Sequence, residues 1–165
     1  MSLAIITGST GLVGSESVNF FHDIGFDVIG IDNNLRKFFF GDSGSTNWIK
    51  SKLLKRNKRF KNYSIDIRNY NALDKIFKKY SKSISIIIHC AAQPSHDYGK
   101  NFPFLDFNIN ATGTLNLLEL TKKYCSNSPF IFMSTNKVYG DNPNKLKLFE
   151  KKTRWELKKN DKNFR

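Results

Sequence analysis

Cysteine is scarce in this sequence, which has only Cys90 and Cys125 among 165 residues. These two cysteines have neither the short spacing of a metal site nor the number needed for a disulfide framework. We therefore expect no metal centre. A reducing cytoplasm is the simplest location for a protein with this cysteine usage.

Long apolar runs are also lacking. No stretch is long and apolar enough to span a membrane, and the N-terminus has neither the basic start nor the cleavage site of a signal peptide. The early isoleucines, Ile5 and Ile6, fit a buried first strand instead. A length of 165 residues suits one domain that can bury a core. We therefore expect a cytoplasmic protein that has no membrane partner.

Positive charge is missing from the start of the chain, although the formal net charge is +13. Residues 1–34 contain no Lys or Arg, whereas residues 35–62 contain nine basic residues and residues 136–165 contain ten. Basic segments of this kind occur in proteins that bind nucleic acid. We favour a solvated lysine-rich surface, because no recognisable nucleic-acid-binding module accompanies the charge.

Glycine is not abundant, but three of the ten glycines fall close together, at Gly8, Gly11 and Gly14. They follow an apolar run and precede an amphipathic segment over residues 12–24, a pattern that predicts strand, tight turn and helix. Glycines let a pyrophosphate approach the backbone, and the N-terminus of the helix attracts its charge. A glycine-rich hairpin is the weaker interpretation, because a helical pattern follows the last glycine.

An acidic residue, Asp32, ends a second apolar run over residues 26–31, roughly 20 residues beyond the glycines. In a dinucleotide-binding unit, a carboxylate at this place accepts hydrogen bonds from the ribose hydroxyls of NAD and repels the 2′-phosphate of NADP. Arg36 and Lys37 lie close enough in the sequence to weaken that preference. We favour NAD as the cofactor.

The rest of the chain alternates between strand and helix patterns. Further strands are predicted over residues 61–65, 83–89 and 129–133, and further helices over residues 48–58, 70–80 and 102–124. This alternation predicts an α/β fold, a Rossmann-type doubly wound parallel sheet that is truncated after about the fifth strand. We assign residues 1–140 to an incomplete NAD-binding Rossmann domain and residues 141–165 to a basic polar tail.

Three local expectations can be compared directly with a structure. The helix over residues 102–124 should bury a stripe of Phe107, Ala111, Leu115 and Leu118, which Leu117 and Leu120 widen. The three consecutive phenylalanines, residues 38–40, cannot all face the core of one element. The tail should form loop and a fragment of helix around residues 153–159.

Taken together and in this order, several short motifs resemble the extended short-chain dehydrogenase/reductase family, which includes NAD-dependent sugar-nucleotide epimerases and dehydratases. The motifs are Thr7-Gly8-x-x-Gly11-x-x-Gly14, Asp32, Asp66-Ile67, His89-Cys90-Ala91-Ala92, Asn110-Ala111-Thr112-Gly113-Thr114, and Ser134-Thr135 before Val138-Tyr139-Gly140. The resemblance covers residues 3–140. It implies NAD as cofactor, a nucleotide-sugar substrate and a homo-oligomeric complete enzyme.

A narrower resemblance points to epimerases of this family that act at C2 of a CDP-linked dideoxyhexose by transient oxidation. It is carried by Gly30-Ile31-Asp32-Asn33-Asn34, Phe39-Phe40-Gly41 with Ser45-Thr46, Gln93-Pro94-Ser95-His96-Asp97, Asn136-Lys137 and Arg154-Trp155-Glu156. Another nucleotide-sugar epimerase, such as a 4-epimerase, and a non-catalytic NAD-binding module stay open as alternatives. A dehydratase is disfavoured, because Asn136-Lys137 stands where such enzymes have an Asp-Glu pair.

The resemblance also implies roles for individual residues. Contact with the cofactor is implied for Gly8, Thr10, Gly11, Leu12, Val13, Asp32, Asn33, Arg36, Asp66, Ile67, Cys90, Ala91, Ala92, Asn110 and Met133. Contact with the substrate is implied for Gln93, Pro94, Ser95, His96 and Asn136. Thr135 matches the catalytic Ser/Thr that hydrogen-bonds the reacting oxygen of the sugar.

The family's general base, a tyrosine followed four residues later by lysine, is lacking. The residues four positions after the six tyrosines are Ile67, Asp74, Ile84, Phe102, Ser128 and Pro143. In the family, the lysine lowers the pKa of the tyrosine so that it can accept a proton near neutral pH. We therefore expect this chain to be the amino-terminal part of such an enzyme and to be inactive alone.

Overall fold

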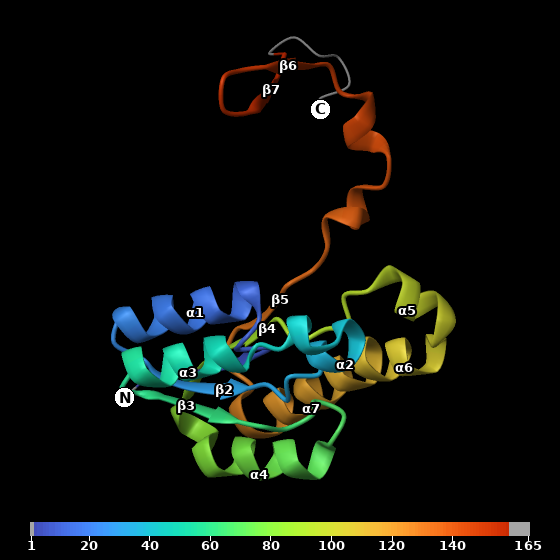
Figure 1. Cartoon of the computed structure of the whole chain (residues 1–165). Coiled ribbons are helices and arrows are strands. Elements are labelled where there is room, and N and C mark those ends of the chain that lie inside the picture. The colour runs from blue at the N-terminus through green and yellow to red at the C-terminus, as the bar shows by residue number, and fades with distance from the viewer. Residues whose placement is uncertain (1, 159–165) are drawn as a thin grey trace. The chain divides into compact units, whose positions relative to one another are not determined.

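The computed structural model describes residues 2–158, apart from the side chains of residues 136 and 137, and contains a parallel sheet of five strands (Figure 1). The strands are β1 (Leu3–Thr7), β2 (Asp27–Ile31), β3 (Phe60–Tyr63), β4 (Ile84–His89) and β5 (Phe130–Phe132). Their order in the sheet is β3-β2-β1-β4-β5. The chain winds outwards in both directions from β1, so the predicted Rossmann-type α/β fold is confirmed.

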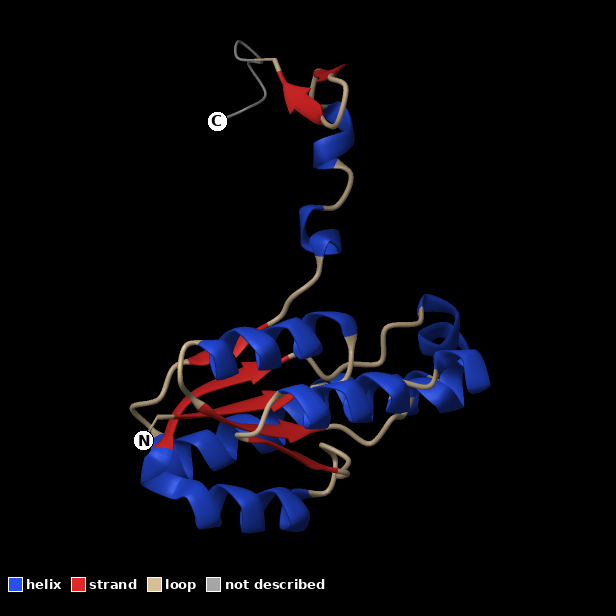
Figure 2. Ribbon diagram, turned by 60° about the vertical axis from the view of Figure 1, so that its left-hand side comes forward, coloured by secondary structure: helices blue, strands red, loops and turns tan. Residues whose placement is uncertain are grey.

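Helices cover both faces of this sheet (Figures 1 and 2). One face carries α1 (Leu12–Asp23) and α3 (Asn47–Arg56), and the other carries α4 (Tyr70–Tyr80) and α7 (Gly113–Cys125). Successive side chains of a strand point to opposite faces. Ala4 and Ile6 of β1 therefore join the cluster with α1 and α3, whereas Leu3 and Ile5 join the cluster with α4 and α7.

Short helices occupy the connections. They are α2 (Arg36–Phe40), η1 (Asp42–Gly44), η2 (Ser81–Ser83), α5 (His96–Asn101) and α6 (Pro103–Phe107). In α2, Phe39 is buried while Phe38 and Phe40 are exposed, as the sequence predicts for three consecutive phenylalanines. Among residues 2–158, no helix is long and apolar enough to cross a membrane.

The long helix predicted over residues 102–124 is interrupted by a π-helical turn. The turn, η3 (Asn108–Thr112), lies between α6 and α7. The hydroxyl of Thr114 donates to the main-chain carbonyl of Asn110 over 2.6 Å. This hydrogen bond attaches the first turn of α7 to the π-turn.

The predicted buried stripe is wrong for its four main residues. Phe107, Ala111, Leu115 and Leu118 are exposed, whereas Leu117 and Leu120, which were predicted to widen the stripe, are buried. The buried face also contains Ile109 and Gly113. Gly113 lets the helix approach the loop after β3 closely, since a Cβ there would lie 2.5 Å from Cδ1 of Ile67.

Residues 134–165 form a second compact unit, separate from Met1–Met133. Its described elements are η4 (Asn136–Tyr139), η5 (Asn142–Lys145), β6 (Leu148–Glu150) and β7 (Trp155–Leu157). The two strands pair antiparallel, so the helix predicted over residues 153–159 is wrong for its described part. The Glu156 carboxylate accepts from Arg154 and Lys151, which stabilises the hairpin turn. The predicted domain boundary at residue 140 stays a prediction.

Replacement of two adjacent leucines would test which face of α7 is buried. Leu117→Ala should lower the free energy of unfolding by about 2–5 kcal/mol, because Leu117 is fully buried. Leu118→Ala should lower it by less than about 1 kcal/mol, because 43% of Leu118 is exposed. Urea unfolding followed by circular dichroism measures both, and equal losses would contradict this orientation of the helix.

Candidate functional site

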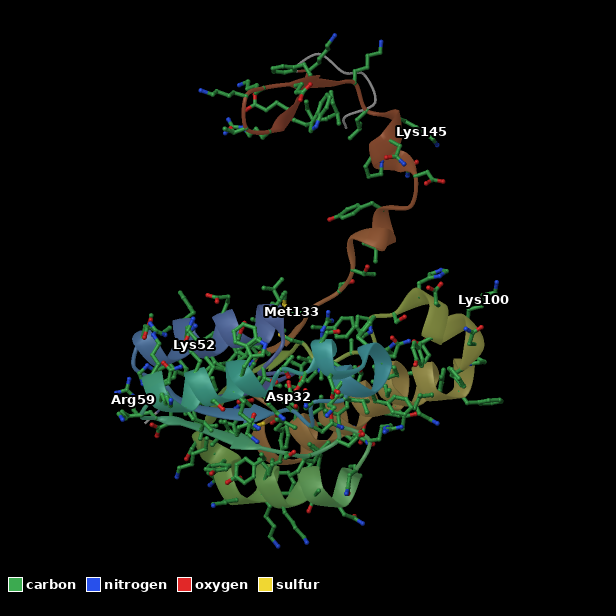
Figure 3. All side chains as sticks on the ribbon, in the orientation of Figure 1. Asp32, Lys52, Arg59, Lys100, Met133 and Lys145 are labelled. Carbon is green, nitrogen blue, oxygen red and sulfur yellow. The ribbon has the colours of Figure 1, made fainter. Side chains whose placement is uncertain are left out.

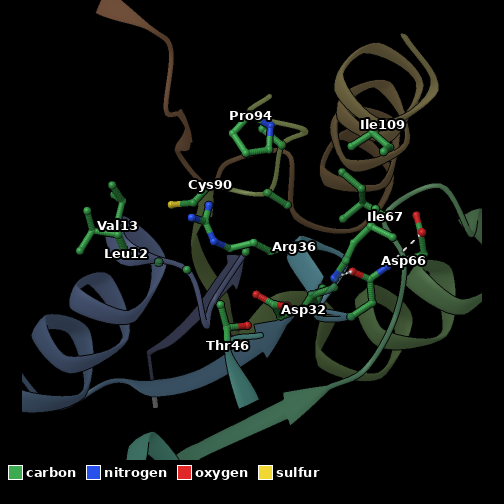
Figure 4. Close-up of a pocket in the computed structure, with 18 of the residues that line it drawn as sticks. Leu12, Val13, Asp32, Arg36, Thr46, Asp66, Ile67, Cys90, Pro94 and Ile109 are labelled. Carbon is green, nitrogen blue, oxygen red and sulfur yellow. Dashed lines mark hydrogen bonds between the residues drawn. The ribbon is translucent and has the colours of Figure 1, made fainter. Parts of the chain in front are cut away.

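A cavity of about 260 Å³ opens at the carboxyl ends of β1, β2 and β4 (Figure 4). Its wall combines the glycine turn after β1, the segment after β2, the loop after β3 and the loop after β4. All residues predicted to contact a cofactor, except Thr10, Asn110 and Met133, line this cavity. Segments that lie far apart in the sequence are thus brought together at one edge of the sheet, where open α/β sheets bind ligands.

The glycine turn depends on close backbone packing. Gly8 has a φ of +63°, and a Cβ there would lie 2.7 Å from the backbone nitrogen of Ala91. A Cβ on Gly14 would lie 2.0 Å from the carbonyl oxygen of Gly8. Gly11 is less restricted, since the nearest atom to its Cβ would be the Gly8 oxygen at 3.2 Å. Gly8 and Gly14 are therefore required by the fold, and Gly11 faces the cavity.

The N-terminus of α1 borders the cavity at Leu12 and Val13. Within the described residues, no side chain caps this end of the helix. Both side chains are exposed, and Figure 4 shows them at the start of this helix. Uncapped N–H groups and the positive end of the helix dipole suit an anion.

The carboxylate of Asp32 is held by backbone donors from both sides. Its Oδ2 accepts from the N–H of Thr10 over 3.0 Å, and its Oδ1 accepts from the N–H of Asn34 over 2.8 Å. A carboxylate oxygen can accept more than one hydrogen bond, so Asp32 keeps acceptor capacity toward the cavity. Thr10, which does not line the cavity, thus orients a residue that does.

A second set of contacts joins this acid to the segment before α3. The Oδ1 of Asn34 accepts from the backbone N–H of Thr46 over 2.8 Å, and the hydroxyls of Thr46 and Thr10 lie 2.7 Å apart. Thr46 is buried and also lines the cavity. Its contribution is missing from the sequence-based site, although Ser45-Thr46 belongs to the motifs of the narrower resemblance.

Asp66, on the opposite side of the cavity, forms an ion pair with Arg68. Its oxygens accept from Nε and Nη2 of Arg68 over 2.9 and 2.7 Å and from the side-chain amide of Asn33 over 3.0 Å. Burial would raise the pKa of Asp66, but the hydrogen bonds from Arg68 outweigh this effect and lower the pKa. Asp66 is therefore ionised at neutral pH and ties the loop after β3 to the loop after β2.

The side chain of Gln93, a predicted substrate contact, is buried and engaged within the protein. Its amide nitrogen donates to the Ser95 carbonyl and to Asp106 Oδ1, both over 2.9 Å. Its backbone N–H donates to Asn110 Oδ1 over 2.9 Å, and Asn110 donates in turn to Asp106 over 3.0 Å. Asp106 is a residue that sequence reasoning missed. Its position four residues before Asn110 on a helical pattern was the available signal.

Of the remaining predicted residues, only Pro94 lines the cavity within the described part of the chain. His96 is exposed on α5. Met133 is partly exposed, and its N–H donates to the His89 carbonyl over 3.1 Å. Thr135 belongs to the second compact unit, and the side chain of Asn136 lies outside the described part of the structure.

The basic residues of residues 35–62 lie at the surface. Figure 3 shows Lys52 and Arg59 projecting from the α3 side of the molecule, away from Asp32. Arg59 donates to the His22 carbonyl over 2.7 Å, and Arg56 pairs with Asp23 over 2.8 Å. These arginines therefore connect α1 to α3 and the loop after it.

The fold and the cavity define a Rossmann-type protein with a glycine turn at the uncapped N-terminus of its first helix and an acidic residue after its second strand. Residues 5–155 match a family model described as GDP-mannose 4,6 dehydratase, and the chain belongs to this family. The match agrees with the resemblance to NAD-dependent epimerases and dehydratases.

Three relatives illustrate the similarity. CDP-paratose 2-epimerase of Salmonella typhi is 38% identical over 137 residues, which are 83% of this chain and 38% of the relative. UDP-glucose 4-epimerase of Thermotoga maritima, solved with UDP-glucose, is 30% identical with a TM-score of 0.67, over 86% of this chain and 40% of that chain. UDP-glucose 4-epimerase of Thermus thermophilus, solved with NAD, is 26% identical with a TM-score of 0.58, over 75% and 34% of the two chains. This chain thus spans less than half the length of each.

The pH dependence of stability should report the buried histidine at the end of β4. Burial lowers the pKa of His89 from 6.5 to about 4. As the pH falls from 6.5 to about 4, His89 takes up a proton in the unfolded chain but not in the folded chain. The free energy of unfolding therefore falls by about 3 kcal/mol. Stability is therefore retained above pH 6.5 and lost toward pH 4.

Equilibrium urea unfolding at neutral pH and at about pH 5 measures the part of this loss that falls above pH 5, about 2 kcal/mol. His89→Gln should remove much of the difference between the two pH values. His96→Gln, a change at an exposed histidine, is the control and should retain it. An unchanged difference in His89→Gln would contradict the assignment.

Proposed function

We propose that this chain is the NAD-binding part of a nucleotide-sugar epimerase. The observation that carries the proposal is that Asp32 and the glycine turn line the same cavity (Figure 4). An acid and an uncapped helix N-terminus at this edge of a Rossmann sheet suit the ribose and the pyrophosphate of a dinucleotide. The NAD complex of the Thermus thermophilus relative supports the choice of cofactor.

The donor set of the cavity fits the adenosine and pyrophosphate part of NAD. Gly11 and the first N–H groups of α1 would hold the pyrophosphate, and Asp32 would accept from the adenosine ribose. Asn33, Asp66 and Ile67 would meet the adenine, and Arg36 lies nearby. The small residues 90–92 leave room for the cofactor to extend along the loop after β4. Asn110 would act from behind this loop, through Gln93.

For the complete enzyme, we propose epimerisation at C2 of a CDP-linked dideoxyhexose. The 38% identity to CDP-paratose 2-epimerase supports this substrate. The two UDP-glucose 4-epimerases described above are less similar to this chain, at 30% and 26% identity. Bound NAD would supply reversible hydride acceptance at the sugar carbon. Thr135 would donate to or accept from the reacting oxygen, and Pro94, Ser95, His96 and Asn136 would contact the substrate.

A binding module without turnover is the second candidate for the chain alone. The observation that favours it is the lack of any tyrosine followed four residues later by lysine. A threonine hydroxyl is too weak an acid to replace that base near neutral pH, and general acid–base help is worth about 10²–10⁴-fold in rate. Chromatography of CDP-paratose incubated with the chain would distinguish the two, because only a catalyst yields the epimer.

Association into a homo-oligomer also remains a proposal. Leu115 and Leu118 are exposed on α7, which resembles the dimer helix of the family. The edge strand β5 exposes Ile131 and Phe132. Apolar side chains on a helix and on a sheet edge favour association.

The first prediction from this proposal concerns cofactor choice. NAD should bind about tenfold or more tightly than NADP, because the Asp32 carboxylate attracts ribose hydroxyls and repels a 2′-phosphate. Asp32→Asn should narrow that ratio. Asp74→Asn, at a carboxylate on α4 that pairs with Lys123, should leave it unchanged. Calorimetric titration of both cofactors decides, and tighter binding of NADP by the wild-type chain would contradict the proposal.

The second prediction separates the two functions of the glycine turn. Gly11→Val should abolish NAD binding while the far-ultraviolet circular dichroism stays near that of the wild type, because only the cavity side is filled. Gly14→Ala should lower the thermal stability instead, because its Cβ would meet the Gly8 carbonyl at 2.0 Å. Retained NAD binding in Gly11→Val would show that the phosphate-binding turn is misassigned.

A further inference from the structure

A continuous line of hydrogen bonds passes through the buried ring of His89. On one side, the Thr7 hydroxyl lies 2.6 Å from His89 Nδ1 and accepts from the backbone N–H of Ala91 over 3.1 Å. On the other side, His89 Nε2 lies 2.9 Å from the Thr114 hydroxyl, which contacts the Asn110 carbonyl over 2.6 Å. The line therefore joins β1, β4 and the π-turn η3.

The chemistry of the two ends fixes the direction of every proton in this line. A carbonyl can only accept, so the Thr114 hydroxyl must donate its single proton to Asn110 and must accept from His89 Nε2. Nδ1 is then the acceptor of the neutral ring, and the Thr7 hydroxyl donates to it. The contacts thus require one tautomer, the neutral ring with its proton on Nε2.

Both ends of the line act on the loop after β4. Thr7 holds the backbone N–H of Ala91, and the side chain of Asn110 holds the backbone N–H of Gln93 over 2.9 Å. Cys90, Ala91, Ala92 and Pro94 of this loop line the cavity. The loop also packs closely against Gly8, where an added Cβ would lie 2.7 Å from the Ala91 nitrogen.

The surroundings of His89 keep the ring in place and dry. Only 2% of the residue is exposed, and the rings of Phe130 and Phe132 have their centroids 5.9 and 5.7 Å away. Burial lowers its pKa to about 4, so the ring is neutral at physiological pH. The proposed hydride chemistry requires no proton transfer from this residue, which leaves its two hydrogen bonds as its contribution.

We infer that His89 is a positioning residue that sets the cavity wall formed by Cys90, Ala91, Ala92 and Pro94, by coupling Thr7 on one side to Thr114 and Asn110 on the other. The inference about the wall rests on geometry alone, and its effect on NAD binding rests on the proposed function. If the His89 ring only filled space, replacing Thr114 would weaken only the hydrogen bonds of Asn110 and Gln93. If the ring couples the two sides, the same replacement also weakens the hydrogen bond of the Ala91 N–H, which Thr7 and not Thr114 accepts.

Amide hydrogen exchange followed by nuclear magnetic resonance on the 165-residue chain tests this transmission. Thr114→Val should raise the exchange rate of the Ala91 amide about fivefold to tenfold relative to core amides such as that of Ile5. Thr7→Val should raise that of the Gln93 amide in the same way. Thr114→Ser keeps the hydroxyl, so the Ala91 and Gln93 amides of this variant should exchange at the wild-type rates.

The matched control is Thr121→Val on the same helix. The buried Thr121 hydroxyl donates to the Leu117 carbonyl over 2.7 Å, the same contact that Thr114 makes with Asn110, but without a histidine. This variant should leave the Ala91 and Gln93 amides unchanged. Equal effects of Thr121→Val and Thr114→Val on Ala91, or no effect of Thr114→Val there, would overturn the inference.

A measurement on the wild-type chain keeps the inference falsifiable if a variant fails to fold. The nitrogen chemical shifts of the His89 ring should show the Nε2–H tautomer alone, and the Nδ1–H tautomer would overturn the inference. Calorimetry separates it from the proposed function. Failure of the wild-type chain to bind NAD contradicts the function, whereas the exchange pattern and the tautomer decide on His89.

Discussion

The close approach of the glycine turn to the loop after β4 is the constraint on which the rest of the site depends. A Cβ on Gly8 would meet the backbone of Ala91, and a Cβ on Gly14 would meet the backbone of Gly8. Because backbone meets backbone at both points, no rearrangement of side chains could relieve a clash. This packing brings the N-terminus of α1 and the carboxyl end of β4 to the same cavity.

Two polar networks hold the loops on either side of this contact. On the β2 side, Thr10, Asp32, Asn34 and Thr46 join the glycine turn to the segment before α3. On the β4 side, the hydrogen bonds through His89 join β1, the strand before the glycine turn, to the π-turn η3. Buried polar groups are costly when they lose a partner, so networks of this kind favour one arrangement of the loops. A cavity of fixed shape follows, and a fixed shape reduces the ordering that binding a ligand would require.

The sequence predicts the sheet better than the later helices, for physical reasons. Apolar runs bounded by Gly8 and Asp32 determine the first strands, and the alternation with helices leaves few other topologies. The predicted stripe on α7 fails because Gly113, which an apolar pattern does not count, packs against Ile67, and this contact leaves Leu115 and Leu118 on the exposed face. The helix predicted over residues 153–159 fails because β7 instead pairs with β6, a strand that the sequence analysis did not predict, and Glu156 pairs with Lys151 and Arg154. Thr46 and Asp106 were missed because their partners, Asn34 and Gln93, are distant in the sequence and meet only in the folded chain.

The position of the cavity along the chain bears on why both 2-epimerases and 4-epimerases resemble this protein. The lining residues fall between Gly8 and Ile109, ahead of Thr135. Under the proposed function, these residues would contact the cofactor, and the cofactor is the same whether the sugar is oxidised at C2 or at C4. The choice of carbon would depend on how the sugar is held, and therefore on residues outside the cavity wall. Similarity over residues 5–155 is then weighted toward the part that such enzymes share. A measurement of cofactor preference is therefore the more direct test of this chain. Which carbon of the sugar is oxidised has to be tested in the complete enzyme.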